Sequence, residues 1–139
     1  MATPIIPDTI TVHLGAPDSS AQNVTVSFTD YIKNVASSEI YPTWPENAIR
    51  ANIYAIISFA LNRYYTEFYR SKGYNFDITS STQYDQKFIN NREVFENISL
   101  CAGNEVYCKV LRQEDQGLIL RFTAGHADFC ARAMTTAAE

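Results

Sequence analysis

Alternation of polar and apolar residues near the start of the chain predicts a β-hairpin. Residues 9–14 alternate, residues 15–20 are rich in turn-forming types, and residues 23–28 alternate again. Two alternating runs on either side of a turn-rich stretch are typical of paired antiparallel strands. The sequence therefore predicts an N-terminal hairpin over residues 9–28.

A helical period replaces this alternation from Thr29 onward. Four apolar residues recur at a spacing that places them on one helix face: Tyr31, Ile32, Val35 and Ala36. The residue before a proline is biased away from helical conformation. Because Pro42 follows, we expect this short helix to end by about Tyr41.

A longer helix is predicted next. Thr43-Trp44-Pro45-Glu46 matches a capping box, with Thr43 as the N-cap and Glu46 three residues later. Apolar residues then cover much of the helix circumference to about Arg70, so we expect a central and mostly buried helix. Gly73 is a plausible residue to close it.

The remaining pattern is weaker. Residues 75–91 are rich in Ser, Thr, Asn and Gln and predict an ordered polar loop, and residues 93–99 suit a short helix. Residues 105–111 and 117–123 alternate and could form a C-terminal hairpin. The predicted class is therefore α+β.

Composition narrows the functional classes. The chain has 139 residues, which suits one domain, and 46% hydrophobic residues, as in an ordinary globular protein. Its net charge of -4 and pI near 5.1 lack the basic footprint of a nucleic-acid binder. The opening residues lack the basic start and apolar run of a signal peptide, and no segment is apolar enough to span a bilayer.

Several kinds of chemistry are not indicated by the motifs. The odd number of three cysteines, with no closely spaced pair, argues against a disulfide framework. His126 and Cys130 are four residues apart, but two ligands make a poor metal site. The sequence contains no phosphate-cradling glycine loop and no nucleophile elbow, so we expect neither a metal nor a cofactor.

Glu39 is the residue that best suits catalysis. It lies near the C-terminal end of the first predicted helix, where the helix dipole disfavours a negative charge. Ile40, Tyr41 and Trp44 follow and could desolvate its carboxyl group, which acts in the same direction. A carboxyl group that keeps its proton near neutral pH can serve as a general acid. The alternative interpretation is a solvated surface glutamate.

Polar residues of the 75–91 loop form a second group of candidates. Asp77, Thr79, Ser81, Thr82 and Gln83 could bind sugar hydroxyls. They could equally hold the loop together through side-chain turns, which is the usual role of such residues. Aromatic residues are plentiful, with 9 Tyr and 8 Phe, and aromatic faces suit sugar rings as well as core packing.

Three blocks of residues follow one another along the chain. The first block is Tyr31-Ile32 with residues 35–39; the second contains Trp44-Pro45 and the small and apolar positions of the following helix. The third is Asp77-Ile78-Thr79 with Thr82-Gln83-Tyr84. In this order the blocks resemble the SpoIID/LytB domain family, that of stage II sporulation protein D, and most closely its clostridial branch. The resemblance covers roughly residues 10–99.

This resemblance implies cell-wall work. Sporulation members are lytic transglycosylases that cut peptide-free peptidoglycan strands between MurNAc and GlcNAc with a single acidic residue, which maps onto Glu39. One carboxyl group suffices if it acts first as acid and then as base. Peptidoglycan and a cell-wall amidase are the implied partners, and the cell wall or spore envelope the implied location. The implied substrate-binding residues are Tyr31, Trp44, Asp77, Thr82 and Gln83.

The chain also departs from the family pattern. Ile57 stands where the family usually has Arg, and Asn52 where Gln is common. Cleft-lining segments expected after Ser99 have no counterpart in residues 100–139. We therefore expect an incomplete domain over residues 1–99 and a divergent tail over residues 100–139, for which a frameshift or recombination is our hypothesis. A glycan-binding or amidase-enhancing module without cleavage, or an inactive fragment, stays open as an alternative.

Overall fold

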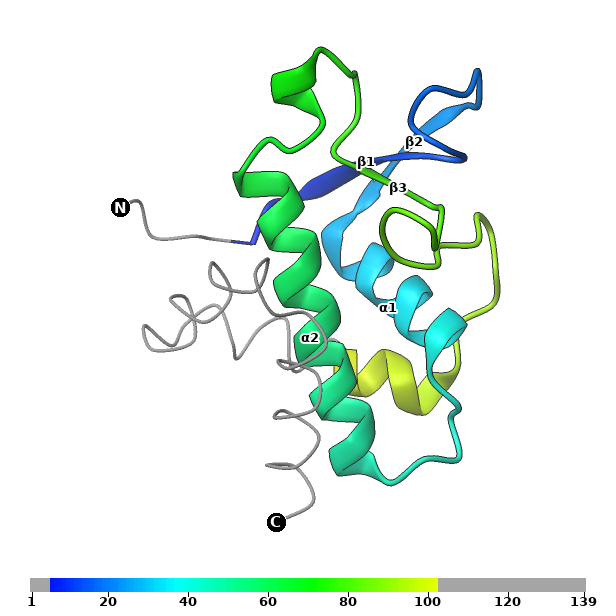
Figure 1. Cartoon of the computed structure of the whole chain (residues 1–139). Helices are drawn as coiled ribbons and strands as arrows, with labels where there is room; N and C mark the ends of the chain where they lie inside the picture. Colours follow the sequence, from blue (N-terminus) through cyan, green and yellow to red (C-terminus); the bar gives the residue numbers. More distant parts are fainter. Residues whose placement is uncertain (1–5, 103–139) are drawn as a thin grey trace.

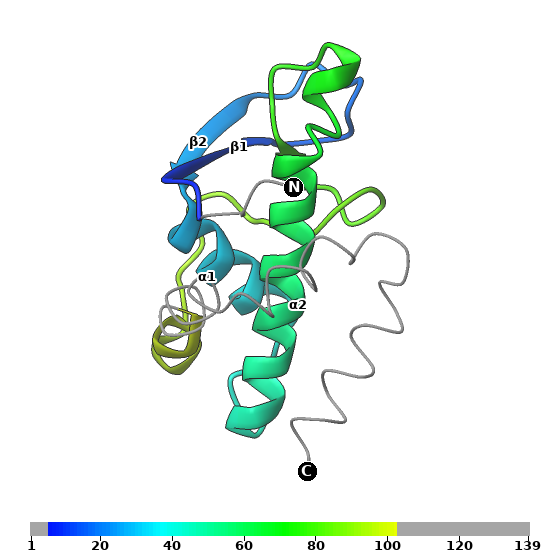
Figure 2. The same ribbon diagram turned by 90° about the vertical axis from the view of Figure 1, so that its left-hand side faces the viewer.

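A computed structural model describes residues 6–102 of the chain. In this part, a small sheet lies at one end and two α-helices cross beneath it, so the α+β class predicted from the sequence is confirmed (Figure 1). Figure 2 shows from the side that the long helix α2, Glu46–Tyr65, runs the length of this unit. The predicted hairpin over residues 105–123 lies outside the described residues.

The three-stranded sheet has the order β2-β1-β3. Strands β1 (Thr9–His13) and β2 (Asn23–Ser27) pair antiparallel, with Ile10 opposite Val26, which confirms the predicted hairpin. Strand β3 (Ile78–Thr79) pairs with β1 in parallel. It falls inside the stretch expected to be a loop, because two residues are too short to show a strand period.

Helix α1 (Phe28–Glu39) begins directly after β2. The Ser27 side chain caps it by accepting a hydrogen bond from the Asp30 backbone N–H at 3.1 Å. The apolar face identified from the sequence is fully buried against the sheet and α2. The helix ends when Ile40 turns extended, two residues before Pro42, as the proline predicts.

The start of α2 corrects the sequence prediction. Its N-cap is Pro45, without any side-chain cap hydrogen bond, so Thr43 and Glu46 do not form a capping box. Glu46 is instead the first helical residue and forms an ion pair with Arg50 one turn later, at 3.1 Å. The proline at the N-cap has the extended backbone, φ -55° and ψ 145°, that lets the chain enter the helix without a polar cap.

The C-terminal end of α2 is also earlier than expected. The helix stops at Tyr65 rather than near Arg70, and Glu67 adopts a positive φ of 51°. A separate 3-10 turn, η1 (Arg70–Lys72), follows and closes at Gly73, whose φ of 94° suits glycine. The predicted glycine stop is therefore real, but it ends η1 rather than α2.

One continuous core joins the sheet, both helices and the last described segment. As expected, α2 is central: Ile49, Ile53 and Ile57 on it are at most 1% exposed. Residues 96–102 are helical, close to the helix predicted over 93–99, and add Ile98 and Ala102 to the same core. This arrangement places the C-terminal end of α1 beside the chain segment that precedes residue 96.

Candidate functional site

Glu39 is the last residue of α1, and its carboxylate faces a segment far away in the sequence. Its Oε1 accepts a hydrogen bond from the backbone N–H of Lys87 at 3.0 Å. Among the described residues, Glu39 forms no ion pair with a basic side chain. The residue remains exposed, so the carboxyl group can be reached from solvent.

The pKa of Glu39 is raised, in the direction predicted from the sequence. Partial burial of the carboxyl group is the main cause, and the hydrogen bond and charge of Lys87 oppose it. The carboxyl group is therefore partly desolvated on a residue that is still exposed to solvent. The raised pKa is what a proton donor needs, although the shift alone assigns no role.

The segment that meets Glu39, residues 85–89, is anchored residue by residue. Gln86 is buried and links the two helices: its Oε1 accepts from the Tyr31 hydroxyl of α1 at 3.0 Å, and its Nε2 donates to the Ile56 carbonyl of α2 at 3.1 Å. Phe88 is buried and stacks on the Tyr31 ring, with the centroids 5.5 Å apart. These contacts fix the backbone on both sides of Lys87.

Asn34 holds the C-terminal end of this segment, at Ile89. Its Nδ2 donates to the Ile89 carbonyl at 2.7 Å, and its Oδ1 accepts from the Ile89 N–H at 3.0 Å. A side-chain amide that pairs with both groups of one backbone residue replaces a strand partner at that position. Asn34 and Glu39 lie on the same helix, so α1 is hydrogen-bonded to the 85–89 segment at two points.

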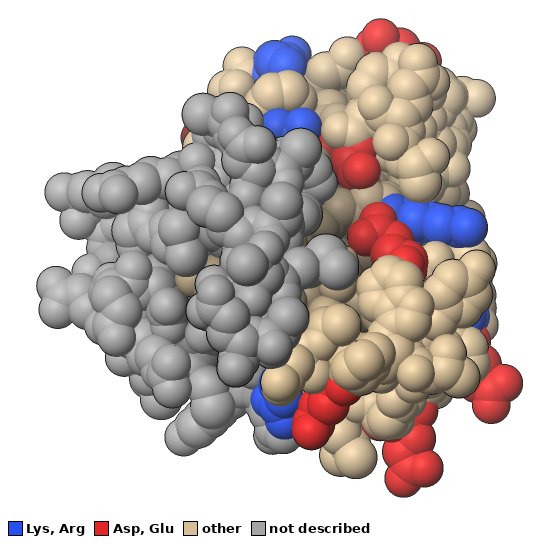
Figure 3. All heavy atoms as spheres, turned by 60° about the horizontal axis from the view of Figure 1, so that its bottom comes forward, with Lys and Arg blue, Asp and Glu red and all other residues tan. Residues whose placement is uncertain are grey.

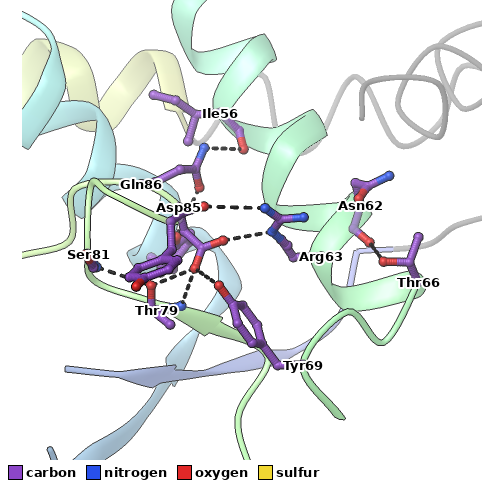
Figure 4. A network of polar contacts seen from close by, with 11 residues as sticks. Ile56, Asn62, Arg63, Thr66, Tyr69, Thr79, Ser81, Asp85 and Gln86 are labelled. Carbon is purple, nitrogen blue, oxygen red and sulfur yellow. Dashed lines mark hydrogen bonds and ion pairs between the residues drawn. The ribbon is translucent and has the colours of Figure 1, made fainter. Parts of the chain in front are cut away.

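Asp85 holds the N-terminal end of the 85–89 segment. Figure 4 shows its carboxylate at the centre of a polar network between α2, β3 and the loop. Oδ1 accepts from Arg63 Nε at 2.8 Å, and Oδ2 accepts from the Tyr69 hydroxyl at 2.6 Å and from both the N–H and the hydroxyl of Thr79, at 3.0 and 2.6 Å. The Asp85 side chain is fully buried. Each of its oxygens is therefore satisfied within the protein.

The aromatic candidates lie in different settings. Tyr31 is fully buried and its hydroxyl is already engaged, and burial, with the nearby charges of Asp85 and Glu39, raises its pKa. Trp44 and Tyr41 lie on the connection after Glu39 and are 37% and 68% exposed, with ring centroids 6.0 Å apart. Trp44 and Tyr41 thus present accessible faces, and Tyr31 does not.

The polar candidates of the 75–91 stretch are similarly divided. Asp77 is buried, pairs with Arg70 Nε at 2.7 Å and accepts from the Thr11 N–H at 2.9 Å. Thr82 and Gln83 are exposed on a turn in which the Gln83 N–H donates to the Ser81 hydroxyl at 3.3 Å. Their roles in substrate binding stay predictions.

Two residues central to the site's geometry were missed from the sequence. Asp85 and Asn34 carry no local motif, because each acts on backbone or side chains many positions away. The only available signal was the helical spacing of Asn34, which places it on the buried side of α1 next to Val35. A polar residue on a buried helix face requires a partner, and the partner came from residues 85–89.

Figure 3 shows one face of the molecule, on which Lys and Arg are interspersed with Asp and Glu. Within residues 6–102, no three side chains of His, Cys, Asp or Glu gather closely enough to hold a metal ion. None of the helices in that range is both long and apolar enough to cross a membrane. His126 and Cys130 lie outside the described residues.

The family model described as stage II sporulation protein, SpoIID, matches residues 18–115. No curated protein and no solved structure matches significantly. The matched range contains α1, α2, β3 and the whole 85–89 segment, and it extends past residue 99, where the sequence resemblance was expected to stop. The domain boundary at residue 99 stays a prediction.

Proposed function

This chain belongs to the SpoIID family, a sporulation-related and cell-wall-associated family, and we propose that it cleaves peptidoglycan glycan strands as a lytic transglycosylase with Glu39 as its acid and base. The observation that carries this proposal is the setting of Glu39. It is an accessible carboxyl group that forms no ion pair with any described residue, and its pKa is raised by partial burial.

The proposed reaction needs one carboxyl group in two protonation states. Protonated Glu39 donates its proton to the glycosidic oxygen between MurNAc and GlcNAc, and the bond to the anomeric carbon breaks. The 6-hydroxyl of the same MurNAc then attacks that carbon while the Glu39 carboxylate takes its proton. The product carries a 1,6-anhydro end, and Glu39 is again protonated. The reaction consumes no water molecule and needs no second carboxylate.

The surroundings of Glu39 suit a carboxyl group that must act in both its protonated and its ionised state. The Lys87 N–H donates to Oε1, which leaves Oε2 as the oxygen that can carry and deliver the proton. The exposed rings of Tyr41 and Trp44 follow Glu39 by two and five residues and could stack on sugar rings. The site thus combines a proton donor with aromatic faces suited to sugar rings.

A second function is favoured by one specific observation. The contact between Glu39 and Lys87 has a structural use, because it ties the end of α1 to a distant segment. If that is its only use, the exposed aromatics could still bind glycan, and the protein would be a binding or amidase-enhancing module. The two functions share a ligand and differ in whether a bond is broken.

The test is an assay on peptide-free glycan strands. The full chain is incubated with amidase-treated peptidoglycan, and the products are analysed by mass spectrometry. We expect 1,6-anhydro ends from the wild type and a loss of about 10²–10⁴-fold in Glu39→Gln, which keeps the size and the hydrogen-bond acceptor but cannot donate an acidic proton.

Glu93→Gln is the matched control, because it makes the same change at an exposed acid of the described chain. It should keep wild-type activity. Co-sedimentation with glycan but no anhydro product would support the binding module. Cleavage by Glu39→Gln at the wild-type rate would contradict the role of Glu39.

A further inference from the structure

The hydrogen bond donor that Glu39 uses is a backbone group, so its position depends on what holds the backbone. Lys87 lies midway between Asp85 and Ile89, and its side chain is exposed. Nothing in the Lys87 side chain is required to direct its N–H toward Glu39. The direction is set by the anchors on either side.

We infer that Asp85 and Asn34 are positioning residues for Glu39: they clamp the two ends of the 85–89 segment and so hold the Lys87 N–H against the Glu39 carboxylate. As a statement about catalysis this inference rests on the proposed function. As a statement about geometry it can be tested without substrate.

The clamp at Asp85 is strong because its contacts come from three separate parts of the chain. Arg63 belongs to α2, Tyr69 to the turn before η1, and Thr79 to β3. The Arg63 guanidinium is further held over the Phe68 ring, 3.9 Å from its centroid. A fully buried carboxylate with this many donors has one position, and it carries Gln86 and Lys87 with it.

The clamp at Asn34 fixes the other end relative to the catalytic helix itself. Asn34 is buried on α1, just over one turn before Glu39, and pairs with both backbone groups of Ile89. The distance from α1 to the 85–89 segment is therefore set by a rigid helix rather than by the loop. This is the arrangement that keeps a hydrogen bond to the end of the same helix in register.

Loss of the Asp85 charge and loss of the Lys87 hydrogen bond shift the pKa of Glu39 in opposite directions, which makes the inference testable. Removing the negative charge of Asp85 can only favour ionisation of a neighbouring acid, which would lower the pKa of Glu39. The Lys87 hydrogen bond favours the ionised carboxylate, so losing this bond would raise the pKa of Glu39. The direction of the shift therefore identifies the mechanism.

The experiment titrates the Glu39 carboxyl carbon by ¹³C NMR and measures amide exchange at Lys87 in the full chain. Asp85→Asn and Asn34→Ala should each raise the pKa of Glu39 by about half a unit or more and should accelerate exchange of the Lys87 amide. Asp77→Asn is the matched control, a buried aspartate that also pairs with an arginine and a backbone N–H, but on β1 and η1. It should change neither quantity.

If Asp85→Asn fails to fold, Asn34→Ala decides alone, because it removes no charge. An unchanged or lowered pKa of Glu39 in the folded clamp variants would overturn the inference, as would an equal rise in Asp77→Asn. If the wild type yields no anhydro products while the clamp variants shift the pKa, the positioning is upheld and the proposed function fails. If the wild type is active, the clamp variants should show the same upward shift in the alkaline limb of their pH–rate profiles relative to the wild type.

Discussion

Asp85 and Glu39 are two carboxylates of the same protein with opposite surroundings. The side chain of Asp85 is fully buried, forms an ion pair with Arg63 and accepts from three further donors. Glu39 is exposed at the end of α1, accepts one backbone hydrogen bond and forms no ion pair within the described part of the chain. Both oxygens of Asp85 are therefore occupied by donors, whereas Glu39 keeps Oε2 available to a ligand.

The difference indicates a structural role for Asp85 and agrees with the chemical role proposed for Glu39. Asp85 keeps distant segments together and has no free oxygen for a ligand. Glu39 holds less of the structure and keeps one oxygen available. Asp85 and Lys87 are separated in the sequence by one residue, Gln86, so the anchored position of Asp85 determines where Glu39 finds its hydrogen bond.

The largest expected effect on stability follows from breaking the Asp85 side of this comparison. Asp85→Asn leaves the mostly buried Arg63 without its counter-charge and sets an amide against several donors. We expect the free energy of unfolding to fall by about 3–5 kcal/mol, measured by urea denaturation. A loss below about 1 kcal/mol would contradict the structural role of Asp85.

A smaller effect is expected at the link between the two acids. Tyr31→Phe keeps the ring stacked on Phe88 but removes the hydroxyl that donates to Gln86, leaving a buried acceptor unpaired. We expect a loss of about 1–3 kcal/mol in the same denaturation experiment. Tyr41→Phe, at an exposed ring, is the control and should be close to neutral.

The Glu39 side predicts a pH dependence with a definite sign. Because the folded-state pKa is raised above 4.5, the folded protein binds the Glu39 proton more tightly than the unfolded chain. Stability contributed by this proton is present below the unfolded-state pKa and is lost as pH rises through the folded-state pKa. Glu39→Gln never ionises and escapes this loss.

We therefore expect the melting temperature of Glu39→Gln, relative to the wild type, to increase as pH rises from about 4 to about 7. Thermal melting at a series of pH values measures this difference. A difference that stays constant or decreases over the range would show that the pKa of Glu39 is not raised.

The smallest effect concerns the Lys87 side chain. Its charge lowers the pKa of Glu39, but less than the hydrogen bond from its own backbone. In Lys87→Gln the N–H stays in place, so the pKa of Glu39 should rise by less than it does in Asn34→Ala. NMR titration of both variants compares them, and a larger rise in Lys87→Gln would mean that the ammonium group, and not the anchored backbone, controls this acid.

Local patterns predicted those parts of the fold that local physics dictates. The hairpin, α1 with its buried face, and the central α2 all follow from residue periods and the proline after Tyr41. The capping box failed because Pro45 brings an extended backbone to the N-cap, so Thr43 lies outside the helix. The end of α2 failed because Glu67 adopts a left-handed conformation that its residue type does not announce.

The sequence anticipated only the helical end of the candidate site. Glu39 and the raised direction of its pKa could be anticipated from the end of α1, although partial burial, and not the helix dipole, is the main cause in the structure. Strand β3 and the 85–89 segment could not be anticipated, because their conformation is fixed by single side chains. Asp85, for example, accepts hydrogen bonds from donors on remote elements.

The sequence by itself determined where the helices and the hairpin form, the α+β class and the family to which the chain belongs, since each depends on the identity and spacing of nearby residues. Only the tertiary structure decided that the carboxylate ending α1 meets the Lys87 N–H, forty-eight positions away, and that Asp85 and Asn34 hold it there. Hydrogen bonds between distant segments leave no periodic trace, because they depend on how whole elements pack against one another.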